Sequence, residues 1–116
     1  MDEFTINLLN IQGLTQVKMV EIEDFIKNKE SCNIFCLTET QLKRNHIKTS
    51  PNVNYIHRMR KLNDKKGGGL SIIWKNNEKV FIEELENTHP DILLAKCRIK
   101  NKNFYILLVY LSTKRA

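Results

Sequence analysis

The stretch Asn33-Ile34-Phe35-Cys36-Leu37-Thr38-Glu39-Thr40 decides the fold predicted for this chain. Its first part, Ile34 to Leu37, is a short apolar run with β-branched and aromatic residues, which is typical of a buried strand. Glu39 follows directly after this run. In open α/β sheets, ligands bind at the edge formed by the carboxyl ends of the strands. Glu39 is therefore a candidate binding residue, with an ordinary solvated loop carboxylate as the alternative.

A second apolar run, Phe4 to Leu9, comes earlier and ends in the same way at a polar residue, Asn10. The segment between the two runs predicts a helix, because Thr15 is a preferred N-cap residue and apolar residues follow it at helical spacing. These apolar residues are Met19, Ile22, Phe25 and Ile26. A strand, a helix and a strand predict a parallel pair, so Asn10 and Glu39 are expected at one edge of the sheet.

The rest of the chain predicts strands. Gly67-Gly68-Gly69 precedes the strand-like run Leu70 to Trp74, whereas a phosphate-binding loop requires a following helix. The glycines therefore predict a hairpin bend with close backbone packing. Further strands are predicted over residues 55–60, 79–85, 92–99 and 104–111, the last two forming a hairpin around a turn at 100–103. The expected fold class is α/β: one βαβ unit, then a mostly antiparallel set of strands, in a single domain spanning residues 1–116.

Five short motifs occur in a recognisable order: Asn10-Ile11-Gln12-Gly13-Leu14, a lysine-bearing helix, Leu37-Thr38-Glu39-Thr40, Gly67-Gly68-Gly69-Leu70-Ser71-Ile72 and Val109-Tyr110. Together they resemble the endonuclease/exonuclease/phosphatase superfamily, in particular the apurinic-endonuclease-like domain of non-LTR retrotransposons. The resemblance extends over nearly the whole chain but over only the first half of such a domain. It implies a partial α/β sandwich, that is, a truncated domain of this superfamily.

Members of this superfamily hydrolyse phosphodiesters or phosphomonoesters with a divalent metal, usually Mg²⁺. By resemblance, Glu39 is the metal ligand, and Asn10 and Tyr110 are catalytic: Asn10 orients the metal shell or the attacking water, and Tyr110 contacts the phosphate. From the sequence alone, Tyr110 is equally well interpreted as an aromatic residue at a sheet edge. Gln12 stands where some relatives carry a metal-binding Asp. The family's later Asp-x-Asn segment and Asp-His pair have no counterpart before Ala116, so we expect no activity from the chain alone.

The net charge of +6 is concentrated in one part of the chain. Residues 43–66 carry a net charge of +7, and all other residues together carry −1. A concentrated basic segment indicates a polyanionic partner, most economically DNA, although a solvated lysine-rich loop is the alternative. The residues expected to bind nucleic acid are Lys43, Arg44, Arg58, Arg60, Lys61, Lys65 and Lys66.

Three functions follow from these observations. The first is a fragment of a retrotransposon-derived, Mg²⁺-dependent DNA endonuclease, completed by a missing C-terminal half. The second is a non-catalytic remnant that binds nucleic acid through its basic segment, and the third is a phosphomonoesterase of the same superfamily. We also expect an exposed apolar sheet face that promotes self-association, formed by Ile72, Trp74, Ile106, Leu108 and Tyr110.

Composition places further bounds on the protein. No apolar stretch approaches the length of a membrane span, and the acidic start resembles neither a secretion signal nor a transit peptide, so we expect a nuclear or cytoplasmic protein and no membrane partner. Cys32, Cys36 and Cys97 form no Cys-x-x-Cys pair and are expected to be small core residues in a reducing compartment. The histidines show no ligand spacing, and none is assigned a role.

Overall fold

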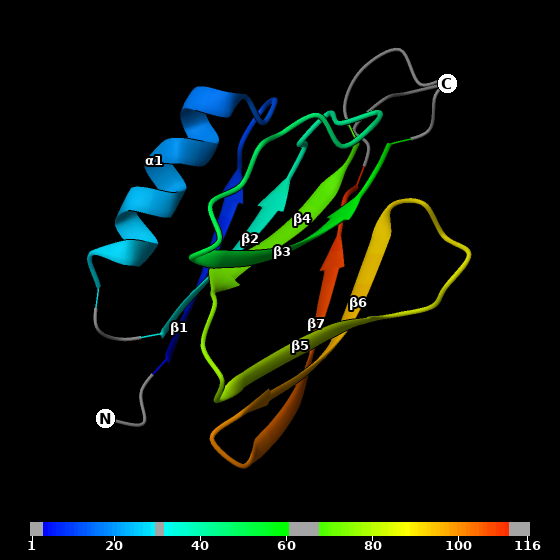
Figure 1. Cartoon of the computed structure of the whole chain (residues 1–116). Helices are drawn as coiled ribbons and strands as arrows, with labels where there is room; N and C mark the ends of the chain where they lie inside the picture. The colour runs from blue at the N-terminus through cyan, green and yellow to red at the C-terminus, as the bar shows by residue number, and fades with distance from the viewer. Residues whose placement is uncertain (1–3, 30–31, 61–67, 112–116) are drawn as a thin grey trace.

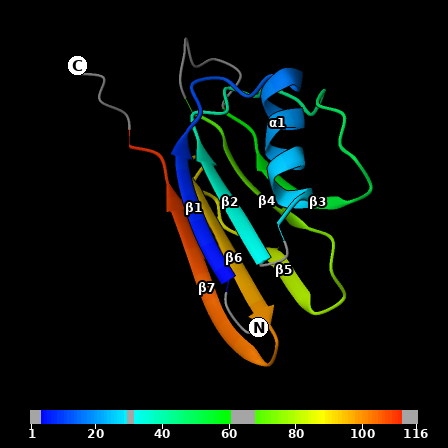
Figure 2. The same cartoon turned by 90° about the vertical axis from the view of Figure 1, so that its left-hand side faces the viewer.

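The computed structural model describes residues 4–29, 32–60 and 68–111. Its elements, in chain order, are β1 (Phe4–Asn10), α1 (Gln16–Lys27), β2 (Cys32–Thr38), β3 (Val53–Arg58), β4 (Leu70–Lys75), β5 (Val80–Leu85), β6 (Ile92–Ile99) and β7 (Lys102–Val109). The strands form a four-stranded sheet in the order β1-β2-β4-β3 and a three-stranded sheet in the order β5-β6-β7. Helix α1 covers one face of the four-stranded sheet, and the three-stranded sheet packs on the other (Figures 1 and 2).

The βαβ unit has the predicted form. β1 and β2 pair in parallel, with Asn10 opposite Thr38 in the register. Helix α1 connects them, and the Thr15 side chain accepts a hydrogen bond from the backbone N–H of Lys18 at 3.2 Å. The predicted N-cap is thus confirmed. All other strand pairs are antiparallel, so the predicted α/β class with a mostly antiparallel second part is also confirmed.

Two strands begin earlier than the sequence indicated. β3 spans Val53–Arg58 rather than 55–60, because Val53 is buried and pairs with Lys75, whereas Arg60 has left the sheet and donates its backbone N–H to Leu42. β7 begins at Lys102 because the turn before it needs only two residues, 100 and 101, with φ values of 48° and 68°. Two successive positive φ angles are typical of the tight turn that joins twisted antiparallel strands.

A first core cluster fills the space between the two sheets. Its central members from the four-stranded sheet include Ile34, Ile72 and Trp74, and those from the other sheet include Ile106 and Leu108. The expectation of an open apolar face at Ile72, Trp74, Ile106 and Leu108 is therefore wrong, because these side chains are only 0–8% exposed. The three-stranded sheet of the same chain covers them, and Tyr110 packs against the cluster at its margin.

A second core cluster lies under helix α1. Met19, Ile22 and Ile26 pack there on Leu37 and Ile73 of the four-stranded sheet, among other apolar residues. Burying this helical stripe fixes the helix against the parallel strand pair.

Three predicted core residues differ in their burial. Phe25 was predicted on the buried stripe of the helix, but it is 43% exposed and meets the Phe35 ring edge-on at its margin. Cys36 and Cys97, in contrast, are buried free thiols between the sheets, as predicted, and burial raises the pKa of each to about 11. Their inertness as nucleophiles follows from this burial.

Apolar side chains remain exposed at one side of the sandwich. β1 is an edge strand and exposes Ile6 and Leu8, and β7 is an edge strand of the other sheet and exposes Leu107. Figure 2 shows β1 and β7 lying along the same side of the molecule. Within the described ranges, no helix is both long enough and apolar enough to cross a membrane.

Candidate functional site at the strand ends

The structure brings Glu39 and Tyr110 together. The Tyr110 hydroxyl donates a hydrogen bond to Oε1 of Glu39 at 3.1 Å, joining residues that are 71 positions apart in the chain. Asn10 ends the neighbouring strand, and the loop after it is tied to Glu39, since the backbone N–H of Gly13 donates to the Glu39 carbonyl at 2.7 Å. The Asn10 side-chain oxygen accepts from the backbone of Gln12 at 3.3 Å. We refer to Asn10, Glu39 and Tyr110 as the rim site.

The backbone around the rim site is conformationally strained. Glu39 has a φ of 56°, in the left-handed region that residues with a Cβ rarely adopt. Positive φ angles also occur in the segments that contact it, at Gln12, Gly13, Gln41, Gly68 and Gly69. Such strain persists only where the surrounding contacts hold the backbone in place, and it is often found at functional sites.

The glycine run supplies part of that support. Gln41 donates its backbone N–H to Gly68 at 2.9 Å, and Thr40 donates to Gly69 at 3.1 Å. A Cβ atom on Gly69 would lie 2.9 Å from the backbone nitrogen of Gln41 and would overlap the Thr40 side chain. The predicted close backbone packing is thus confirmed for Gly68 and Gly69, whose partner is the loop that carries Glu39, whereas Gly67 lies outside the described residues.

Lys18 is a supporting residue that sequence reasoning missed. From the first turn of α1, its Nζ donates to the carbonyls of Ile11 at 2.8 Å and Gly13 at 3.0 Å. These bonds hold the loop after β1 against the helix. A positive charge in the first turn of a helix interacts unfavourably with the helix dipole. This unfavourable position is the feature of the sequence that indicates a specific partner for Lys18.

The chemistry of the rim site is that of oxygen ligands. Burial, and then the hydrogen bond to Glu39, raise the pKa of Tyr110, so its hydroxyl stays protonated and remains a donor at neutral pH. The Glu39 carboxylate and the Asn10 amide oxygen are ligands that Mg²⁺ prefers, and Mg²⁺ is commonly held by one or two carboxylates plus substrate phosphate. Glu39 and Asn10 thus offer oxygen atoms of the type that Mg²⁺ binds. Among the described residues, however, no group of three His, Cys, Asp or Glu side chains converges on a metal position.

No protein-family model matches the chain, and no curated protein matches it either. The interpretation of the rim site therefore depends on the geometry of the strand ends and on the resemblance of the motifs.

The predicted nucleic-acid-binding residues have different surroundings. Arg58 is engaged within the protein: its guanidinium forms an ion pair with Glu84 at 3.5 Å and donates to the carbonyls of Asn87 at 2.9 Å and His89 at 2.7 Å. It thereby ties β3 to the connection between β5 and β6. Arg60 is only 8% exposed.

Only part of the predicted basic set is displayed on the surface. Lys43 and Arg44 are exposed in the loop after Glu39. Lys61, Lys65 and Lys66 lie outside the described residues. Lys43 and Arg44 are therefore the members of this set that the structure shows to be accessible to a polyanion next to the rim site.

A histidine–serine pair lies elsewhere and has a structural role. His57 Nδ1 is 2.6 Å from the Ser71 hydroxyl oxygen, a pairing that the sequence did not indicate. Ser71 has no exposed surface, so no substrate reaches it as a nucleophile. Burial lowers the pKa of His57 to about 4, so the ring is neutral at physiological pH.

Proposed function

We propose that this chain provides one wall of a Mg²⁺-dependent endonuclease site that hydrolyses DNA phosphodiesters. The observation that carries the proposal is the Tyr110–Glu39 hydrogen bond at 3.1 Å, at the edge where β1 and β2 end. The adjoining loop exposes Lys43 and Arg44, which suits the approach of a phosphate backbone.

Each residue of the rim site has a defined task in this proposal. Glu39 would hold the ion, with the Tyr110 hydroxyl fixing one carboxylate oxygen and leaving the other directed to the metal. Asn10, a neutral donor and acceptor, would orient the attacking water or the ion's water shell. The bound Mg²⁺ would stabilise negative charge on the scissile phosphate.

Water activation needs groups that the described rim does not supply. A general base typically contributes 10²- to 10⁴-fold to such a reaction. Because the described residues contain no acidic or histidine cluster, the chain by itself is expected to bind the metal weakly and to leave DNA uncut. Activity would arise when another polypeptide segment completes the site.

Metal binding is tested with Mn²⁺ as a paramagnetic substitute for Mg²⁺. In ¹⁵N spectra of the wild-type chain, amide signals near Asn10, Glu39 and Tyr110 should broaden first. Glu39→Gln should abolish this selective broadening, whereas the matched substitution Glu78→Gln, in the exposed turn before β5, should preserve it. Broadening that survives Glu39→Gln, or that centres on another part of the chain, would contradict the assignment.

Catalysis is tested separately by nicking of supercoiled plasmid with Mg²⁺. The isolated wild-type chain should nick at the rate of the buffer control. Nicking that co-purifies with the protein and disappears in Glu39→Gln would show that the chain contains a complete catalytic site, and the one-wall interpretation would be wrong.

A non-catalytic nucleic-acid-binding role is the second candidate. The exposure of Lys43 and Arg44, together with the absence of a carboxylate cluster among the described residues, favours it over a phosphomonoesterase. It predicts duplex DNA binding that is weakened by Lys43→Gln and unaffected by Glu39→Gln or by removal of metal.

A further inference from the structure

The outer face of the three-stranded sheet has an unusual composition. The antiparallel register aligns Phe81 with Arg98, and Glu83 with Lys96, across β5 and β6. Lys96 in turn lies opposite Tyr105 of β7. In β6, the residues on either side of Lys96 and Arg98 are buried between the sheets, so Lys96 and Arg98 and the residues paired with them point outward. The face thus has one aromatic ring on each outer strand and two cations on the central strand.

These side chains are available to a ligand. Phe81 is 62% exposed and Tyr105 is 63% exposed, which is unusual for large aromatic residues on a soluble protein. Lys96 and Arg98 are also exposed, and within the described part of the chain neither head group has a salt-bridge partner. We call Phe81, Lys96, Arg98 and Tyr105 the sheet platform.

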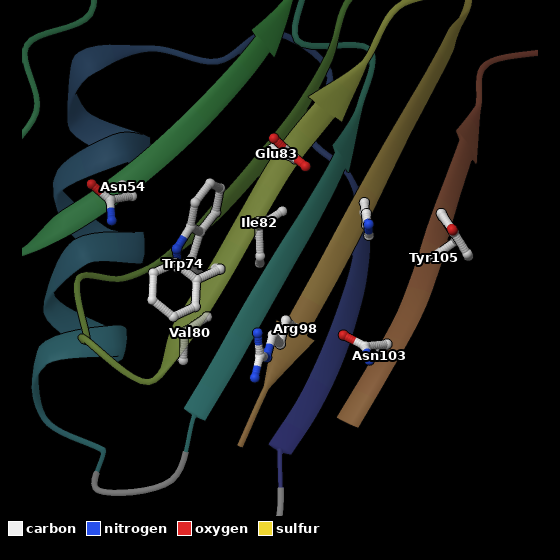
Figure 3. A pocket seen from close by; sticks show the side chains of 10 residues that line it. Asn54, Trp74, Val80, Ile82, Glu83, Arg98, Asn103 and Tyr105 are labelled. Carbon is white, nitrogen blue, oxygen red and sulfur yellow. The ribbon is translucent and has the colours of Figure 1, made fainter. Parts of the chain in front are cut away.

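The platform continues into a hollow of about 840 Å³ that reaches around β5. Figure 3 shows its lining residues on both sheets, with Trp74 on β4 and Arg98 and Tyr105 on the three-stranded sheet. The Trp74 indole N–H is buried and has no hydrogen-bond partner among the described residues. A buried donor without an acceptor is uncommon in folded proteins. This nitrogen has no exposed surface, so a ligand in the hollow contacts the exposed side chains of the platform instead.

Positive charge extends beyond the end of the platform. Lys79 and Lys100 line a second, smaller hollow of about 430 Å³ next to Phe81 and Arg98. Among the outward-facing residues of the three-stranded sheet named above, Glu83 is the acidic one. The ligand that fits is therefore an anion carrying flat, apolar faces.

We propose that the sheet platform binds single-stranded nucleic acid, with bases stacked on Phe81 and Tyr105 and phosphates held by Lys96 and Arg98. Phe81 and Tyr105 are two strand spacings apart and are offset by two residues along the strands, a separation of roughly 12 Å, and the cations lie on the strand between them. Non-sequence-specific proteins bind single strands with this combination of stacking surfaces and basic side chains. In a duplex, the base pairs stacked above and below cover the faces of each base, so duplex DNA cannot stack its bases on the rings.

This surface is separate from the rim site. Tyr105 precedes Tyr110 by five residues along an extended chain, a separation of roughly 17 Å. Binding at the platform requires no metal. It can therefore fail or succeed independently of the endonuclease proposal.

The test is fluorescence anisotropy of a labelled oligothymidylate of about twelve nucleotides, in EDTA and at low salt. Phe81→Ala and Tyr105→Ala should each weaken binding by roughly 5- to 100-fold, the effect of losing one stacked base. Lys96→Gln and Arg98→Gln should each reduce the slope of log affinity against log salt by roughly 0.7. Glu83→Gln should tighten binding, because it removes the negative charge opposite Lys96.

Two control variants come from other surfaces of the chain. Tyr55→Ala removes an aromatic side chain that is 37% exposed on β3, and Lys27→Gln removes an exposed cation from the last turn of α1. Both should retain wild-type affinity for the oligothymidylate. An oligouridylate of equal length, run in parallel, distinguishes DNA from RNA as the preferred single strand.

Three outcomes would overturn the proposal. The first is an absence of single-strand binding, and the second is a duplex affinity equal to the single-strand affinity. The third is a concentration-dependent dimer in light scattering that Phe81→Ala abolishes while oligonucleotide affinity stays unchanged, which would assign the face to a second copy of the chain. Circular dichroism of every variant confirms that the comparison is made between folded proteins.

Discussion

Replacing Gly69 by alanine should destabilise the protein far more than the same replacement at Gly13. Both glycines adopt positive φ, 89° and 94°, so both variants bear the same conformational cost of roughly 1–2 kcal/mol. The two positions differ in the room available for the added Cβ atom. A Cβ on Gly69 would lie 2.9 Å from the Gln41 backbone nitrogen, whereas a Cβ on Gly13 would meet only the flexible Gln41 side chain at 3.5 Å.

The additional steric cost at Gly69 is that of overpacking, roughly 1–3 kcal/mol. At about 4 °C per kcal/mol for a domain of this size, Gly69→Ala should melt roughly 4–12 °C below Gly13→Ala. Thermal unfolding followed by circular dichroism, with urea unfolding as a second measurement, gives this difference directly. Equal melting temperatures for the two variants would show that the glycine run does not press on the loop carrying Glu39.

Two further predictions concern buried or engaged polar residues. Arg58→Gln should lower the free energy of unfolding by roughly 1–3 kcal/mol, because it removes charge-assisted hydrogen bonds to the 87–89 loop. Lys43→Gln, the control, should change the free energy of unfolding by less than about 0.5 kcal/mol. Equal urea midpoints for the two variants would contradict this difference. The pKa of His57 is about 4 in the folded protein and 6.5 when unperturbed. Between pH 4 and pH 6.5 the unfolded chain therefore binds more protons than the folded protein, so the free energy of unfolding should fall as the pH is lowered through this range. His57→Gln should reduce this pH dependence in urea unfolding at pH 7 and pH 5, and an unchanged dependence would remove His57 as its cause.

Local patterns were sufficient to predict the first part of the fold. The apolar runs that end at Asn10 and Leu37, with a capped amphipathic helix between them, allow few arrangements other than a parallel pair. The position of Glu39 at the end of its strand follows from the same pattern. Its contact with Tyr110 required the resemblance as well, because no local pattern links residues so far apart in the chain.

The closure of the sandwich was not predictable in the same way. Alternation in β4 and β7 showed that one face of each strand is apolar, but alternation does not reveal what covers that face. The answer depends on the connection at Asn76 and Asn77, where the chain leaves one sheet and starts the other. Similarly, a charge count identified Arg58 as a basic residue. It did not show that the Arg58 guanidinium is paired with Glu84 and hydrogen-bonded to two carbonyl groups.

The exposed edge of β1 has a consequence for handling and for assembly. This strand, Phe4–Asn10, contains no charged residue and no proline, the features that usually prevent an edge from recruiting another strand. At high concentration, an extended segment of a neighbouring molecule can add to it and seed ordered aggregation. The same edge also permits a productive addition: a strand that joins β1 in parallel would end next to Asn10, delivering its last side chains directly to the rim site.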